Sequence, residues 1–131
     1  MVNDPVADFI IRLKNAGMVR KEEVTLSYSK LKHAIAEKLM EAGFVGAVEK
    51  HGKKVKKTLA VTLKYDAAGD HMIRGVQRIS KPGRRLYKGV ADLHPVKFGR
   101  GKRILSTPEG ILTGEEARAK NVGGEELFII W

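Results

Sequence analysis

The chain has 131 residues, with 25 Lys and Arg against 15 Asp and Glu, a net charge of +10, and no cysteine. This length suits one ordinary domain or two small lobes, and the charge indicates a polyanionic partner, either nucleic acid or an anionic membrane surface. The absence of cysteine excludes disulfides, thiolate metal sites and cysteine nucleophiles, and the absence of a long apolar run favours a cytosolic protein without a membrane span.

A helix is predicted at the N-terminus. Asp4 can cap it, and Pro5 fits the first helical position. Gly17 is expected to end it. The residues at apolar helical spacing are Val6, Phe9, Ile10 and Leu13. The opposite stripe is polar and has the spacing of a solvated face; it comprises Asp4, Asp8, Arg12 and Asn15, of which Asp8 and Arg12 can pair across one turn.

A strand and a second helix follow. Residues 24–28 alternate apolar with polar, which predicts a strand with one buried face. Ser29 is the expected cap of the helix, and Gly43 its end. Two strands, 44–50 and 55–65, surround a turn at 51–52. The apolar stripe of the helix is predicted at Leu31, Ile35, Leu39 and Ala42.

The polar, glycine-containing segment 66–70 is the best place for a lobe boundary. We therefore expect an N-terminal α/β lobe over residues 1–66, with the order helix, strand, helix, strand, strand. A C-terminal lobe would cover residues 67–131. Its first part is predicted as strands 72–79 and 84–88 around a turn, followed by a loop.

The last stretch of the chain is the most informative. A strand at 104–106 precedes a turn at 107–110, where Pro108 and Gly110 suit a type I turn. Thr113 and Glu116 form a capping box for a short helix, 114–120. The closing strand is apolar on both alternating faces, which predicts burial of Leu127, Ile129 and Trp131. The expected fold class is α+β, with a mostly β C-terminal lobe that has one short helix.

Positive charge is concentrated in two runs. Residues 71–103 contain ten Lys or Arg and one acid, and residues 50–64 contain six Lys and no acid. A single run of this kind is usually a solvated face, but two runs in one small protein favour contact with a polyanion.

Catalytic and metal sites are not indicated. The four histidines are scattered and show no metal-ligand spacing. The sequence around Gly99 and Gly101 lacks the further glycine of a dinucleotide fingerprint, and Arg103 stands where a phosphate-binding loop needs Ser or Thr. We expect no enzymatic activity, no cofactor, no metal and no small-molecule substrate.

Several features of the C-terminal half suit RNA. Ser106 and Thr107 offer hydroxyl groups for 2′-hydroxyls, and the glycines at 123–124 permit a close backbone approach. Tyr87 lies between Arg85 and Lys88 and offers a stacking face with cationic neighbours. The alternative for the two hydroxyl residues is an ordinary turn, and for Tyr87 a core aromatic.

Four motifs also carry a resemblance to a known family. In chain order they are DPVADFIIRLKNAGMVR, RISKPGRRLY, ILSTPEGILT and VGGE, followed by a terminal Trp. This pattern resembles the bacterial small-subunit ribosomal protein eight family. The resemblance implies a two-lobed protein that binds the central domain of 16S rRNA early in 30S assembly, beside other small-subunit proteins. In many bacteria such a protein also represses its own operon's mRNA.

The resemblance also nominates residues. It transfers RNA contacts of the C-terminal lobe to Ser106, Thr107, Gly124, Glu125 and Tyr87, and contacts of the N-terminal lobe to Arg12, Asn15, Lys30 and Lys32. The two basic runs add expected phosphate contacts at Lys81, Arg84, Arg85, Lys88, Lys54 and Lys56. The chain departs from the family at Pro108, where a third hydroxyl is usual, and in the basic loop 97–103.

Two rival functions remain. A DNA-binding regulator could place the helix at 29–42 in a groove, but that helix has a full apolar stripe and mixed charge outside it. A membrane-surface protein would need a basic amphipathic helix, which the sequence lacks.

Overall fold

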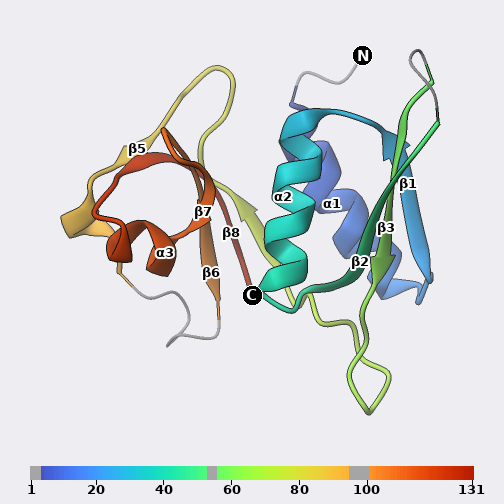
Figure 1. The fold of residues 1–131 in the computed structure, drawn as a ribbon. Coiled ribbons are helices and arrows are strands. Elements are labelled where there is room, and N and C mark those ends of the chain that lie inside the picture. The colour runs from blue at the N-terminus through green and yellow to red at the C-terminus, as the bar shows by residue number, and fades with distance from the viewer. Residues whose placement is uncertain (1–3, 53–55, 95–100) are drawn as a thin grey trace. The chain divides into compact units, whose positions relative to one another are not determined.

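The computed structural model describes residues 4–52, 56–94 and 101–131. The chain groups into two compact units (Figure 1). The N-terminal unit is Asp8–Arg74, and the C-terminal unit joins Met1–Ala7 to Gly75–Trp131. The predicted α+β fold class is confirmed. The lobe boundary expected at residues 66–70 stays a prediction.

Helix α1, Pro5–Met18, forms where the sequence predicts it. Asp4 Oδ1 accepts a hydrogen bond from the Ala7 backbone N–H at 3.2 Å, which satisfies one of the free donors at the helix start. Arg12 Nε pairs with Asp8 Oδ2 at 3.1 Å, as the spacing predicts. The predicted apolar face is buried throughout, and comprises Val6, Phe9, Ile10 and Leu13.

The N-terminal unit contains one antiparallel sheet of three strands. They are β1, Glu23–Ser27, β2, Val45–His51, and β3, Thr58–Leu63, with β3 in the middle. Helix α2, Lys30–Glu41, packs against β2, and Ser29 caps it by accepting from the Lys32 N–H. The predicted order of helix, strand, helix, strand, strand is therefore confirmed.

The apolar stripe predicted for α2 is wrong at its ends. Leu31 is 42% exposed and Ala42 is half-buried. The buried stripe instead runs through Lys32, Ile35, Ala36 and Leu39. A lysine can take such a position because its methylene stem covers apolar surface while its ammonium finds hydrogen-bond acceptors.

The C-terminal unit is mostly β, as predicted, with a five-stranded sheet. Its main path is β4-β8-β6-β7, and β5 also pairs with β8. The strands are β4, Val76–Arg78, β5, Tyr87–Lys88, β6, Lys102–Thr107, β7, Gly110–Thr113, and β8, Gly124–Ile130. The short helices are η1, Val90–Asp92, and α3, Gly114–Ala119, the latter with the predicted capping box.

Two strands of this unit are much shorter than expected. Residues 72–79 give only β4, and residues 84–88 give only β5. Between them, Lys81 and Arg84 exchange backbone hydrogen bonds of 3.0 and 2.9 Å with each other, so their backbone groups are used in a tight turn. Directly before β4, a Cβ on Gly75 would lie 2.6 Å from the Trp131 indole, so only a glycine permits this close approach.

The core of the C-terminal unit lies between its sheet and its short helices. Leu93, Leu105, Leu112 and Ala117 form one buried cluster. In β8, Leu127 is buried as predicted, but Ile129 and Trp131 are only half-buried, so their assignment to the core is wrong. A tryptophan is so large that it is seldom fully enclosed. The fully buried residues of this strand are Phe128 and Ile130.

Candidate nucleic-acid interface

Three of the nominated residues form a row across adjacent strands of the C-terminal unit. Tyr87 of β5 is paired with Glu125 of β8, and Glu125 is paired with Ser106 of β6. Directly opposed residues of antiparallel strands place their side chains on the same face of a sheet. Tyr87 is 71% exposed, so it is not the core aromatic that the alternative reading required. The sheet thus collects an aromatic ring, a carboxylate and a hydroxyl on one face.

Two glycines allow these strands to approach one another closely. A Cβ on Gly124 would overlap the carbonyl oxygen of Ser106, and a Cβ on Gly123 would lie 2.5 Å from the carbonyl oxygen of Lys88. The close approach that the sequence predicts at these glycines is therefore made by the protein's own strands β5 and β6. Contact of Gly124 with RNA stays a prediction.

The two hydroxyl residues differ in their availability. Thr107 Oγ1 donates to the Gly110 carbonyl at 2.8 Å and accepts from the Glu109 N–H at 3.2 Å, so its proton is used inside the turn. The Ser106 hydroxyl has no hydrogen-bond partner among the described residues. A hydroxyl carries one donor and two acceptor positions, so Ser106 can both donate to and accept from a bound molecule, whereas Thr107 can only accept.

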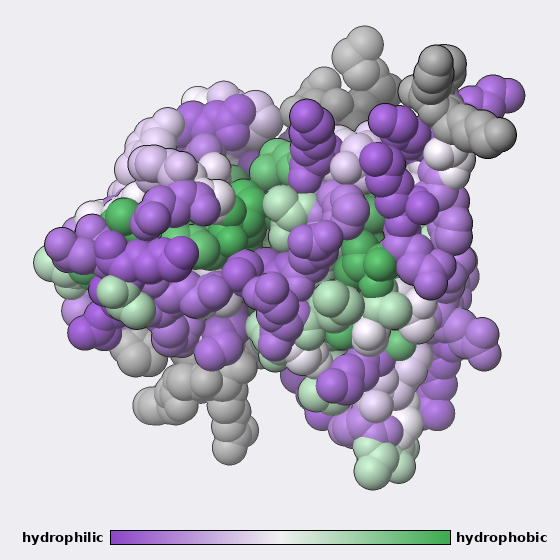
Figure 2. Space-filling view, viewed as in Figure 1, coloured by the Kyte–Doolittle hydropathy of each residue, from purple (hydrophilic) through white to green (hydrophobic). Residues whose placement is uncertain are grey.

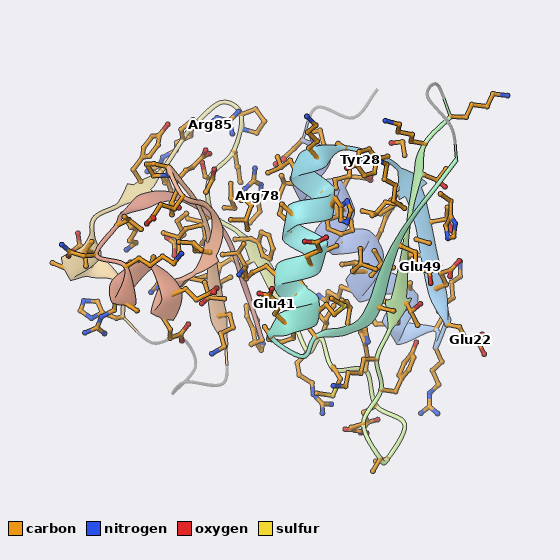
Figure 3. All side chains as sticks on the ribbon, in the orientation of Figure 1. Glu22, Tyr28, Glu41, Glu49, Arg78 and Arg85 are labelled. Carbon is orange, nitrogen blue, oxygen red and sulfur yellow. The ribbon has the colours of Figure 1, made fainter. Side chains whose placement is uncertain are left out.

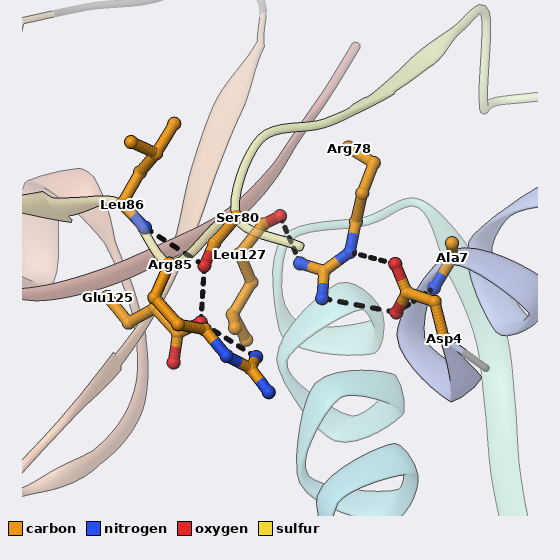
Figure 4. Close-up of polar contacts among 8 residues, drawn as sticks. All are labelled: Asp4, Ala7, Arg78, Ser80, Arg85, Leu86, Glu125 and Leu127. Carbon is orange, nitrogen blue, oxygen red and sulfur yellow. Dashed lines mark hydrogen bonds and ion pairs between the residues drawn. The ribbon is translucent and has the colours of Figure 1, made fainter. Parts of the chain in front are cut away.

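The carboxylate of Glu125 is held by the protein (Figure 4). The fully buried Ser80 donates its hydroxyl proton to Glu125 Oε2 and accepts the Leu86 N–H at 3.1 Å. Arg85 Nη1 lies 3.1 Å from the same Oε2. One buried hydroxyl thus connects β8 to both ends of the basic turn, which we define as residues 81–86.

The sequence did not reveal the role of Ser80. A serine followed by Lys-Pro-Gly has the composition of an ordinary turn, and the sequence predicts only a turn between residues 79 and 84. Its partner Glu125 is 45 residues away, and only the pairing of β8 brings the two together. No local pattern could have shown this contact.

The basic turn and strand β5 supply unpaired positive charge beside the row. Lys81, Arg84 and Lys88 form no ion pair within the described part of the chain. Lys81 and Arg84 are exposed, and Lys88 is half-buried. Figure 2 shows many hydrophilic residues on the drawn face, with apolar residues between them. These three cations are free to contact phosphates.

Other arginines of the same run are structural. Arg78 binds both carboxylate oxygens of Asp4, at 3.0 and 3.2 Å, and donates to the Leu127 carbonyl (Figure 4). Burial opposes the charged form of Asp4, but the hydrogen bonds from Arg78 and Ala7, with the charge of Arg78, hold the pKa of this carboxyl below its usual value. Arg103 likewise pairs with the buried Glu126.

The nominated residues of the N-terminal unit lie in different surroundings. Arg12 and Asn15 are exposed and border an open groove of about 490 Å³ between α1 and β1. Lys30 is exposed at the first position of α2. Lys32 is only 9% exposed, and its ammonium donates to the carbonyl and the hydroxyl of Ser27, both at 3.2 Å. Lys56 is exposed, and Lys54 lies outside the described residues.

Within residues 4–52, 56–94 and 101–131, no group of three or more His, Asp or Glu is placed to hold a metal ion. No helix in these segments is long and apolar enough to cross a membrane.

Comparison with known proteins agrees with the motifs. The model of a family described as ribosomal protein S8 matches residues 4–131. The chain is 43% identical over 130 residues to "Small ribosomal subunit protein uS8" of Rubrobacter xylanophilus, covering 99% of this chain and 98% of that protein. It is 45% identical over 131 residues to the protein of the same name from Streptococcus sanguinis, covering 100% of this chain and 99% of that one. These matches span the whole chain, and it therefore belongs to the ribosomal protein S8 family.

Proposed function

We propose that this protein is a structural component of the small ribosomal subunit that binds the central domain of 16S rRNA directly through its C-terminal unit. The observation that carries the proposal is the row of Tyr87, Glu125 and Ser106 beside three unpaired cations. RNA recognition combines stacking, hydrogen bonds to sugars and ionic contacts with phosphates, and this surface offers a group for each.

Each group has a distinct role in the proposal. The Ser106 hydroxyl exchanges hydrogen bonds with a 2′-hydroxyl, which is the group that distinguishes RNA from DNA. The exposed Tyr87 ring stacks on an unpaired base. Lys81, Arg84 and Lys88 neutralise phosphates and set the salt dependence of binding. Glu125 orients the basic turn through Ser80 and Arg85.

The cellular role follows from the family. The protein would act in the cytoplasm as part of the ribosome, support assembly of the 30S particle and contact neighbouring small-subunit proteins. A messenger RNA that folds like the rRNA site would fit the same surface, so repression of its own operon is part of the proposal.

Filter binding tests the proposal. The wild type is titrated against a 16S central-domain fragment and against duplex DNA of similar length at matched salt. We expect clear preference for the RNA, with Ser106→Ala and Tyr87→Leu each weakening it. Loss of a stacked ring weakens binding by about fivefold to a hundredfold. Lys64→Gln removes an exposed charge at the far end of β3 and serves as the control. Equal or tighter binding to DNA would instead favour a DNA-binding regulator.

A further inference from the structure

A second aromatic side chain with cationic neighbours lies in the N-terminal unit. Tyr28 stands where β1 gives way to α2 (Figure 3). Lys50 Nζ lies 4.8 Å from the centroid of the Tyr28 ring, and Lys57 Nζ lies 5.9 Å from it. The Tyr28 backbone N–H donates to the Lys57 carbonyl at 3.1 Å, which fixes the ring beside the β2-β3 hairpin. A tyrosine ring attracts cations to its face, so the two lysines converge on it.

The Tyr28 ring is held in one orientation. The His33 ring meets it edge to face, with centroids 5.5 Å apart and planes at 76°. His33 Nδ1 lies 3.3 Å from the Tyr28 hydroxyl, and His33 Nε2 lies 2.8 Å from Glu37 Oε1. A ring anchored by its edge and its hydroxyl is a preorganised surface, because it loses little freedom when a ligand covers it.

The two lysines carry charge that the protein does not neutralise. Neither Lys50 nor Lys57 forms an ion pair with an acid in the part of the chain that the structure describes, and both are exposed. The acids nearby are engaged elsewhere, since Glu37 pairs with His33 and Glu49 pairs with His51. Two ammonium groups gathered on one ring repel each other, and a bound anion would relieve that repulsion.

This cluster lies close to Lys32, one of the nominated residues, but its cations are more exposed. The resemblance assigns an RNA contact to Lys32, but Lys32 is only 9% exposed as a residue, and its ammonium donates to the carbonyl and the hydroxyl of Ser27. Contact with a phosphate would require it to leave both oxygens of Ser27. Lys50 and Lys57 are exposed, and their ammonium groups need only move off the face of the Tyr28 ring.

We propose that Tyr28, Lys50 and Lys57 form a second RNA site, which takes an unpaired nucleotide. The base takes the place of the ammonium groups on the face of the half-buried Tyr28 ring, and the displaced ammonium groups take the phosphates on either side of it. An unpaired nucleotide is required because a base inside a duplex presents no free face to a side chain. The inference rests on the proposed function only in that the ligand is RNA; it uses different residues in a different unit.

The test uses the full-length protein and two probes, a single-stranded oligouridylate of about twelve nucleotides and the 16S central-domain fragment. We expect Tyr28→Leu to weaken binding of the oligouridylate by about fivefold to a hundredfold without changing the salt slope. Tyr28→Phe keeps the ring, so it should stay within about threefold of the wild type. Lys50→Gln with Lys57→Gln should lower the salt slope by about 1.4, at roughly 0.7 for each phosphate contact to single-stranded nucleic acid.

Lys64→Gln is the control, because it removes one lysine from the same hairpin at the end away from Tyr28. Wild-type binding by Tyr28→Leu would overturn the proposal, and so would a double lysine variant with the salt slope of the control. If Tyr28→Leu does not fold, as judged by thermal melting, the double lysine variant decides. If the protein binds the oligouridylate but not the 16S fragment, the proposed function is contradicted. Binding of the oligouridylate by the variants then still tests the Tyr28 site.

Discussion

Ser80→Ala tests how the stability of the C-terminal unit is connected to its RNA affinity. It removes a buried hydroxyl that donates to Glu125 and accepts the Leu86 N–H. Leaving a buried polar group without its partner costs about 1–3 kcal/mol of the free energy of unfolding. At roughly 3–4 °C per kcal/mol for a protein of this size, the melting temperature should fall by about 3–12 °C.

The same substitution should also weaken RNA binding. Without Ser80, the basic turn loses its connection to β8, and its cations must be ordered when RNA binds. Ordering one long side chain costs about 0.5–1.5 kcal/mol, which corresponds to a loss of affinity of about twofold to tenfold. The salt slope should not change, because the same cations still contact phosphates.

Ser106→Ala is the matched control for this experiment. It also removes one serine hydroxyl from the same unit, but this hydroxyl has no partner among the described residues. Its melting temperature should stay at the wild-type value while its RNA affinity falls. Melting followed by circular dichroism, together with filter binding at two salt concentrations, measures both quantities. A Ser80→Ala protein that melts within about 1 °C of the wild type would refute the reasoning.

Four further predictions concern other parts of the chain. The folded pKa of Asp4 is lowered, so its contribution to stability is present above its unfolded pKa and is lost as the pH falls through the folded pKa. The advantage of the wild type over Asp4→Asn in melting temperature should therefore shrink with falling pH and disappear once Asp4 is protonated in the folded protein. An advantage that is constant across the acid range would contradict this. Gly124→Ala should lower both stability and RNA affinity, because its methyl group would overlap a backbone carbonyl of β6, and an unchanged melting curve would show that the strands can separate freely. Deletion of residues 130–131 removes a fully buried isoleucine and the backbone pairing of the last residue, so we expect a large fall in melting temperature and loss of RNA binding; an unaffected protein would mean that the strand end is dispensable. Pro108→Ser should change RNA affinity by less than about tenfold, because the new hydroxyl can gain a contact while the loss of turn rigidity weakens binding. A loss of affinity beyond about a hundredfold would mean that Pro108 itself packs against RNA.

Local features of the fold could be predicted from the sequence because their signals lie within a few residues. Asp4 and Ser29 act as helix caps where expected, and Thr113 with Glu116 forms the expected capping box. These contacts join residues three positions apart, so the local amino-acid sequence determines them.

Features that depend on long-range pairing could not be predicted. The burial of Lys32 in place of Leu31 depends on which face of α2 meets the sheet, and both stripes satisfy helical spacing. The Ser80–Glu125 contact depends on the register of β8. The basic runs predicted an electropositive surface, but not that Arg78 would be used in an internal ion pair.

Identification of the protein residues that contact RNA tests the central claim most directly. The wild-type protein is cross-linked with ultraviolet light to the 16S central-domain fragment, and the modified peptides are mapped by mass spectrometry. We predict cross-links in the peptide that contains Tyr87, with protection of Ser106 and the basic turn from chemical modification and proteolysis. Cross-links confined to α3 and β7, with residues 81–88 unprotected, would contradict the claim that the row of Tyr87, Glu125 and Ser106 faces RNA.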